Sequence, residues 1–226
     1  MVDRDEAGIV LVVTLLVMLM MSALSVALVL ITSSETMIAA NFRNSREALQ
    51  AAESAAERAM SDLGSVADWS QALNGGARST FVDGLSTGTR ALQDGTTLDL
   101  AQVLNQANCH RATTCSSAEM DAVTAERPWG ANNPRWQIYA SGPLKDLLPS
   151  AAVDSPYYAV VLVGDDSSEN DNDPLRDGAS QANPGSGVVA VRAQAFGPRG
   201  AHKVLDLTIA RAAHGAIRVL SWRELR

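Results

Sequence analysis

Residues 9–31 read "IVLVVTLLVMLMMSALSVALVLI" and contain no charged residue, glycine or proline. A helix rises about 1.5 Å per residue and the hydrocarbon core of a bilayer is about 30 Å thick, so this run is long enough to cross a membrane. It is longer than the apolar core of a secretory signal peptide, and the preceding "MVDRDEAG" is acidic rather than basic. The sequence therefore predicts a membrane-spanning helix. The single basic residue before it, Arg4, favours a cytoplasmic N-terminus.

The helical pattern continues beyond the membrane-length run. Residues 32–63 again lack glycine and proline, and apolar side chains recur at the spacing of one helix face. We expect an amphipathic helix that continues the first one and ends at Gly64. The alternative to one continuous helix is a membrane anchor followed by a separate core helix. The alanines on the apolar face predict that a head domain packs closely against this half of the helix. The apolar positions are Ile38, Phe42, Leu49, Ala52, Ala56, Met60 and Leu63.

Residues 64–226 have the composition of a globular head domain. Residues 64–97 are rich in Gly, Ser and Thr, which predicts loops with one or two short helical turns. Helices are expected over residues 98–106 and 117–126, the second begun by a capping box of Ser116 and Glu119. Strands are expected over residues 135–140, 157–164, 187–197 and 201–212, with "IRVLSWREL" as a candidate terminal strand. The predicted fold class is α+β, a long N-terminal helix packed on a C-terminal antiparallel sheet.

Charge and cysteine content restrict the functional classes. The formal net charge is −7 and the sequence pI is about 4.9, which argues against a nucleic acid as a direct partner. The two cysteines, Cys109 and Cys115, are separated by "HRATT" and predict a short-loop disulfide if the head lies outside the cytoplasm. A zinc site built from Cys109, His110 and Cys115 is the alternative, but it lacks a fourth ligand.

An acidic stretch, "GDDSSENDNDPLRDG" at residues 164–178, follows one of the expected strands. Carboxylate and amide oxygens are ligands that Ca²⁺ prefers, and Asp171 and Asp173 are the strongest candidates. The order of residues does not match an EF-hand loop, so the pattern favours a solvated acidic loop over a calcium site. The other candidate ligands are Asp165, Asp166, Glu169, Asp177, Asn170 and Asn172.

Two strings resemble enzyme motifs without their context. "GLSTG" at residues 84–88 has the form of a nucleophile elbow with Ser86 as nucleophile, but that motif needs a strand before it and a helix after it. The candidate bases are His110, His202 and His214. "GSGVVA" at residues 185–190 imitates a dinucleotide fingerprint but leads into a strand rather than a helix. We therefore expect no catalysis.

The N-terminal block resembles a known family. "GIVLVVTLLVMLMMSALSVALVL" is followed by "NFRNSREALQAAE", in which the signature residues are Asn41, Arg43, Gln50 and Glu53. This combination resembles the N-terminal region of PilX-type minor pilins of type IV pili. The resemblance covers about the first 60 residues and, more loosely, "RPWGANNPRW", "VRAQAFGPRGAHKV" and "SWREL". It implies a type IV pilin-like fold.

The resemblance also implies how the N-terminus is processed. In type IV pilins a membrane-embedded prepilin peptidase cuts after a glycine just before the apolar run and methylates the new N-terminus. The corresponding bond joins Gly8 to Ile9, which makes residues 1–8 a leader and residues 9–31 the anchoring and filament-core helix. Most major pilins carry a glutamate at the position of Val13. Its absence fits a low-copy subunit at or near the filament tip, and drift in an ordinary membrane anchor is the alternative.

The implied function is that of a minor pilin which helps to prime pilus assembly and sits at or near the tip. The implied partners are other minor pilins, the major pilin, the prepilin peptidase, the assembly machinery and a tip adhesin, with membrane lipid before assembly. The protein would be a single-pass inner-membrane protein with a periplasmic head, and after assembly part of the surface pilus. Alternatives are a minor pseudopilin of a type II secretion system and a signal-anchored extracytoplasmic binding domain that does not polymerise. Whether the pilus serves twitching motility, adhesion or DNA uptake stays open.

Overall fold

The long N-terminal helix is present. A computed structural model describes residues 4–123, 130–148, 154–169, 171–178, 185–212 and 215–225. Helix α1 spans Arg4–Ser65, so it ends one residue after the expected Gly64. The chain divides into two compact units, Met1–Arg43 and Asn44–Arg226, and α1 contributes to both. The helix forms because residues 9–63 consist largely of good helix formers without glycine or proline.

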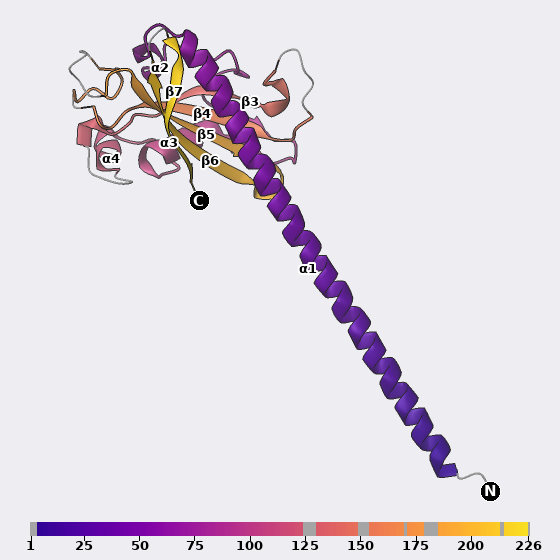
Figure 1. Cartoon of the computed structure of the whole chain (residues 1–226). Helices are drawn as coiled ribbons and strands as arrows, with labels where there is room; N and C mark the ends of the chain where they lie inside the picture. Colours follow the sequence, from indigo (N-terminus) through magenta and orange to yellow (C-terminus); the bar gives the residue numbers. More distant parts are fainter. Residues whose placement is uncertain are drawn as a thin grey trace. The chain divides into compact units, whose positions relative to one another are not determined.

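The second unit contains a five-stranded antiparallel sheet in which every strand pairs with its neighbours in sequence (Figure 1). Its order is β3-β4-β5-β6-β7, so the connections are those of a simple meander. This arrangement confirms the predicted antiparallel sheet, including the terminal strand. The strands are β3 (Gln137–Pro143), β4 (Tyr158–Asp165), β5 (Val188–Phe196), β6 (His202–Arg211) and β7 (Ile217–Leu225).

One face of the sheet packs on the second half of α1. Alternate residues of β4, Ala159, Val161 and Val163, share one hydrophobic cluster with the helix. Small side chains on the helix allow its backbone to approach the sheet closely, as the alanine pattern predicted. The helix residues in this cluster are Ala48, Ala51, Ala52, Ala55, Ala56, Ala59 and Leu63, each at most 1% exposed.

The opposite face of the sheet is covered by α3 (Leu100–Cys109). Val160 and Leu162 of β4 belong to this second cluster, together with Leu100 and Val103 of the helix. Because successive side chains of a strand point to opposite faces, β4 is buried along its whole length. The sequence pattern did not predict this second covering layer.

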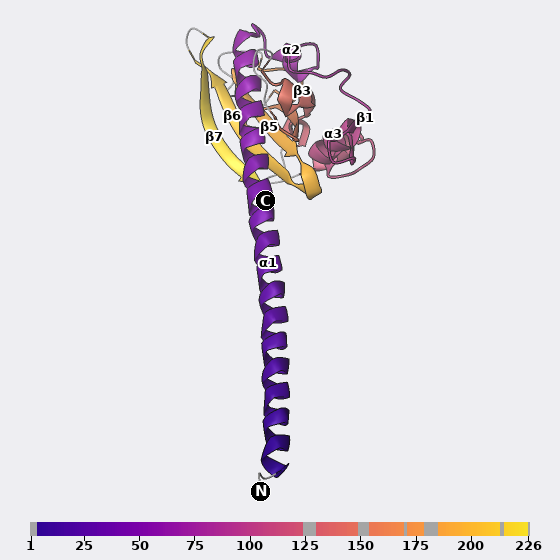
Figure 2. The ribbon, with the colours of Figure 1, turned by 90° about the vertical axis from the view of Figure 1, so that its right-hand side faces the viewer.

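The segment between α1 and the sheet contains a hairpin that was not predicted. Strand β1 (Thr89–Ala91) pairs with β2 (Thr97–Asp99), and Figure 2 shows β1 beside α3. In the turn, the Asp94 carboxylate accepts hydrogen bonds from the backbone and hydroxyl of Thr96, and Gly95 has φ of +83°. The Asp94-Gly95 pair was therefore the signal that could have identified this hairpin.

The short helices of this segment begin at capping residues. Asp99 accepts a hydrogen bond from the backbone of Ala101 at 2.9 Å, so α3 begins at Leu100 rather than at 98. Helix α4 (Ser117–Ala122) begins with the predicted capping box of Ser116 and Glu119. The helix ends at Ala122, because Val123 is extended with φ of −69° and ψ of 113°, so the end predicted at residue 126 is wrong; residues 124–126 themselves lie outside the described residues. The described part of the chain also contains the short helix α2 (Ser70–Leu73) and the 3₁₀ turns Gly130–Asn132, Leu144–Asp146 and Pro198–Gly200.

Candidate functional site

The apolar side chains in the first half of α1 are exposed all around the helix. Between Ile9 and Ile31 the large apolar side chains are 47% to 67% exposed, and Met37 and Ile38 are each 65% exposed. By length and composition α1 is the helix among the described residues that is apolar enough to cross a membrane, a test that a signal sequence would also pass. Hydroxyls within it are satisfied locally, as when Ser25 donates to the carbonyl of Met21 at 2.8 Å.

The predicted processing residues lie in this exposed part of the helix. Gly8 and Ile9 are both helical and exposed, and nothing lies within 4 Å of the position that a Cβ on Gly8 would occupy. Val13 is 52% exposed, so its side chain faces away from other described residues. Exposure of these residues does not test whether the bond between Gly8 and Ile9 is cut, so the cut stays a prediction.

The four signature residues all lie on α1. Gln50 is exposed and Glu53 is half-buried, whereas Ala51 and Ala52 between them are buried in the contact with the sheet. The "QAAE" string thus places two small residues inward and two polar residues outward, as a helix period requires. Asn41 and Arg43 belong to the N-terminal unit and are exposed.

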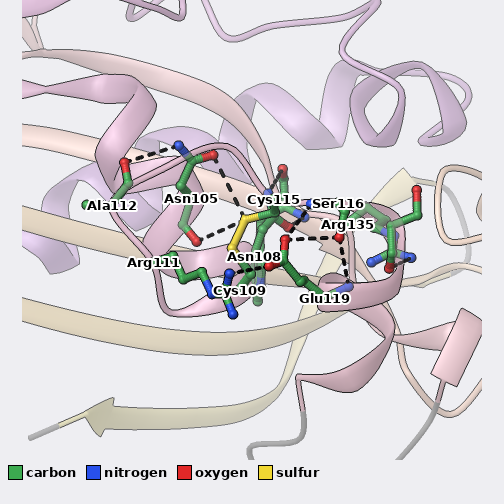
Figure 3. The surroundings of a disulfide bond; sticks show 11 residues. Asn105, Asn108, Cys109, Arg111, Ala112, Cys115, Ser116, Glu119 and Arg135 are labelled. Atoms are coloured by element: carbon green, nitrogen blue, oxygen red, sulfur yellow. Dashed lines mark hydrogen bonds and ion pairs between the residues drawn. A yellow bond between two sulfur atoms is a disulfide. The ribbon is translucent and has the colours of Figure 1, made fainter.

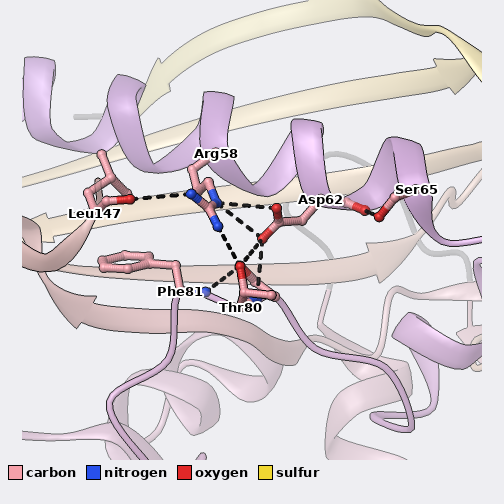
Figure 4. Close-up of polar contacts among 7 residues, drawn as sticks. Arg58, Asp62, Ser65, Thr80, Phe81 and Leu147 are labelled. Carbon is pink, nitrogen blue, oxygen red and sulfur yellow. Dashed lines mark hydrogen bonds and ion pairs between the residues drawn. The ribbon is translucent and has the colours of Figure 1, made fainter. Parts of the chain in front are cut away.

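Charged side chains attach the following loop to the end of α1 (Figure 4). The Asp62 carboxylate accepts hydrogen bonds from the Ser79 hydroxyl and from the backbone N–H of Thr80, the latter at 3.2 Å. Arg58 pairs with Asp62 at 3.2 Å (Nε to Oδ1) and donates to the Leu147 carbonyl at 3.4 Å. This network orients the head on the helix, since one ion pair contacts two separate loops.

The two cysteines form a disulfide, as predicted (Figure 3). Cys109 ends α3, Cys115 precedes α4, and their Cα atoms are 6.0 Å apart. The adjacent Asn108 side chain donates to the Trp136 carbonyl at 3.1 Å and accepts from the Trp136 N–H at 2.8 Å, which attaches the end of α3 to the start of the sheet. Because both sulfurs are bonded to each other, they do not supply thiolates for the alternative zinc site with His110.

The structure separates the predicted calcium ligands. Asp171 and Asp173 form local turns, in which Asp171 accepts from the backbone of Asp173 at 2.9 Å and Asp173 from the backbone of Leu175 at 3.4 Å. Asp166 likewise accepts from the backbone and hydroxyl of Ser168. Asn170 lies outside the described residues.

Asp165, by contrast, lies in a cluster with two acids that had been only secondary candidates. Each of Asp165, Glu169 and Asp177 offers a carboxylate oxygen, and these three atoms lie within 4.8 Å of one another. Asp165 is 3% exposed, Glu169 is fully buried and Asp177 is half-buried. Burial raises the pKa of all three carboxyls, and the charge of Glu169 raises the pKa of Asp165 further. Distance along the chain concealed this group, because Asp177 is twelve positions after Asp165.

The enzyme-like strings lie in ordinary loops. Ser86 is in an irregular segment that precedes the short strand β1, so no helix follows it as a nucleophile elbow requires. Gly185 and Gly187 form a turn that leads into β5, as the pattern indicated. Of the candidate bases, His202 stacks on Phe196 with ring centroids 4.4 Å apart, and His214 lies outside the described residues.

These features define a class of protein with one membrane-length exposed helix whose second half packs on an antiparallel sheet. Comparison with protein families adds the specific assignment: residues 7–57 match the family model described as PilX N-terminal. The match confirms the resemblance to PilX-type pilins over this N-terminal quarter of the chain. Searches of curated proteins and of solved structures gave no significant match.

Proposed function

We propose that this chain is a minor pilin that helps to prime type IV pilus assembly and sits at or near the tip in a complex with other minor pilins. The observation that carries the proposal is that the family match over residues 7–57 coincides with an apolar helix whose first half is not covered by any other described part of the chain. Apolar side chains exposed all around a helix require lipid or other apolar helices as their surroundings. The inner membrane supplies the first before assembly, and neighbouring pilin helices supply the second in the filament.

The absence of an acid at position 13 supports a place at or near the tip. A carboxylate inside an apolar bundle is costly unless it has a partner, so a glutamate there is retained only where a neighbour's amine pairs with it. Val13 makes no such pair. A subunit that begins the filament has no neighbour on one of its sides, so it needs no glutamate to pair with the amine of a neighbour there.

The head would make the lateral contacts. Strand β7 lies at one edge of the sheet, and Val219, Leu220 and Trp222 on it are 42%, 48% and 45% exposed. An edge strand with large exposed apolar side chains is suited to contact another protein. The proposal assigns this edge to contact with other minor pilins and includes no catalytic step or cofactor.

Two measurements test the proposal. Mass spectrometry of the protein isolated from membranes is expected to show a chain that begins at methylated Ile9, whereas a Gly8→Leu variant is expected to keep Met1. The matched control Ala7→Leu, which leaves the cut bond unchanged on both sides, is expected to be processed. A wild-type chain that keeps Met1, or one cut near Ser33, contradicts the assignment and supports an ordinary membrane anchor or a cleaved signal.

The second measurement addresses the priming role. Deletion of the gene is expected to leave few or no surface pili, and the protein is expected to co-purify with sheared pili and with other minor pilins. Normal piliation after deletion contradicts priming. Co-purification with secretion components rather than pili would instead indicate a type II pseudopilin.

A further inference from the structure

The connection between β4 and β5 brings three carboxylates together at the end of the sheet. Asp165 is the last residue of β4, Glu169 follows one turn later, and Asp177 precedes β5. Their carboxylate oxygens lie within 4.8 Å of one another, a separation that oxygen atoms bound to one cation can have. Only Asp177 has substantial contact with solvent, because Asp165 and Glu169 are buried.

The backbone is shaped to admit the Glu169 side chain. A Cβ on Gly178 would overlap Oε1 of Glu169, and a Cβ on Gly185 would lie 2.6 Å from the Glu169 Cβ. Asp177 is held separately, since its Oδ1 accepts a hydrogen bond from the Gly187 N–H at 2.7 Å. The two glycines thus leave room for the Glu169 side chain, and the backbone N–H of Gly187 positions the Asp177 carboxylate.

The three carboxylates lie among other charged side chains. Three carboxylates this close repel one another strongly in a buried site. Arg211 acts on Asp177, but its guanidinium donates to the Val66 carbonyl at 2.7 Å and lies over the Trp69 ring at 4.5 Å. Asp68, Asp166 and Asp171 add further negative charge to the surroundings.

An independent observation also points to a ligand at this place. Oδ1 of Asp165 is buried and has no hydrogen-bond partner among the described residues. A buried carboxylate oxygen without a donor is unfavourable and is rarely left so in a folded protein. Asp165 lies on strand β4 itself, and a cation would provide a partner for this oxygen and offset the charge of the neighbouring carboxylates.

We propose that Asp165, Glu169 and Asp177 bind a Ca²⁺ ion that joins the end of β4 to the start of β5. Calcium fits better than other divalent cations because the donors are all hard oxygens supplied by a long connection rather than by a rigid octahedral frame. This site differs from the one predicted from the sequence, which was centred on Asp171 and Asp173. The carboxylates of those two residues accept hydrogen bonds from the backbone of their own turns. It is independent of the pilin assignment.

The test uses the full-length protein in mild detergent, freed of metal with EGTA. Titration with CaCl₂ in a calorimeter is expected to show one ion bound per chain. At a free Ca²⁺ concentration 100-fold above Kd, the melting temperature is expected to rise by about 5–10 °C relative to EGTA. Absence of both signals overturns the proposal, as does a larger shift with Mg²⁺ than with Ca²⁺.

Variants separate a cation site from a pair of acids that merely share a proton. Asp165→Asn and Asp177→Asn are each expected to weaken Ca²⁺ binding at least tenfold, whereas the exposed Asp173→Asn in the same connection is expected to bind as the wild type does. In EGTA, Asp165→Asn is expected to melt no lower than the wild type, because the substitution removes repulsion. If Asp173→Asn weakens binding as much as Asp165→Asn, the ion lies elsewhere on the acidic connection and the assignment is wrong.

Discussion

Substitution of Ala56 by leucine tests whether the close contact between α1 and the sheet determines the stability of the head. Ala56 is completely buried in the cluster formed by the helix and the sheet. Leucine adds three carbon atoms, which would stabilise the protein by about 2 kcal/mol if there were room to bury them. There is no such room at a fully buried alanine between two backbones, so we expect a net destabilisation of about 1–3 kcal/mol from displaced neighbours.

The matched control is Glu57→Leu, which adds a leucine at the next position on the exposed face of the same helix. A surface change of this kind is expected to stay within about 0.5 kcal/mol. Thermal unfolding of both full-length variants in mild detergent, followed by near-ultraviolet circular dichroism, measures the difference. For a head of this size about 1–3 kcal/mol corresponds to a decrease of roughly 2–12 °C in melting temperature for Ala56→Leu. An unchanged or higher melting temperature for Ala56→Leu would refute the close contact.

Three further predictions concern the head. Replacement of Cys109 and Cys115 by serine is expected to destabilise the head by about 2 kcal/mol, the loop-closure entropy of so short a loop, as measured by thermal melting against the reduced and oxidised wild type. Trp69→Phe removes the indole N–H that donates to the Leu63 carbonyl, 2.9 Å away in the last turn of α1. The free energy of unfolding, measured with a chemical denaturant, is expected to fall by about 1–3 kcal/mol. A variant as stable as the wild type would contradict this prediction. His202 is an exposed residue of β6, but desolvation where its ring stacks on Phe196 lowers the pKa of its imidazole, so the unfolded chain takes up a proton there at a higher pH than the folded chain. Stability from this group is therefore present above about pH 6.5 and is lost as the pH falls below it, and His202→Gln should flatten that dependence in pH-dependent melting.

Local patterns were sufficient wherever a few consecutive residues decide the structure. Three predicted features are of this kind, since each depends on residues that are close together in the sequence. They are the Ser116 capping box, the strands from β3 to β7 and the disulfide of Cys109. The β1–β2 hairpin was missed because its strands have three residues each, which is too short for periodicity to register. The start of α3 was predicted two residues early, because Leu98 reads as helical until the cap at Asp99 is recognised.

The candidate cation site shows the other limit. Acid density along the chain favoured Asp171 and Asp173, but these residues complete turns with their own backbone. Asp165 and Asp177 come together because the chain leaves β4 and returns to β5 at the same end of the sheet. The residue pattern of this connection alone does not predict that its two ends lie side by side.

The order of residues along the chain was enough to predict a continuous helix with an apolar first half and an alanine-lined second half, followed by an antiparallel sheet. Helices and strands can be predicted in this way because their apolar side chains recur every few residues. The covering of the second face of the sheet by α3 and the convergence of three acids at the end of β4 could be recognised only in the folded chain. Those features depend on strand pairing and on which buried surfaces meet, and both join residues that are far apart in the chain.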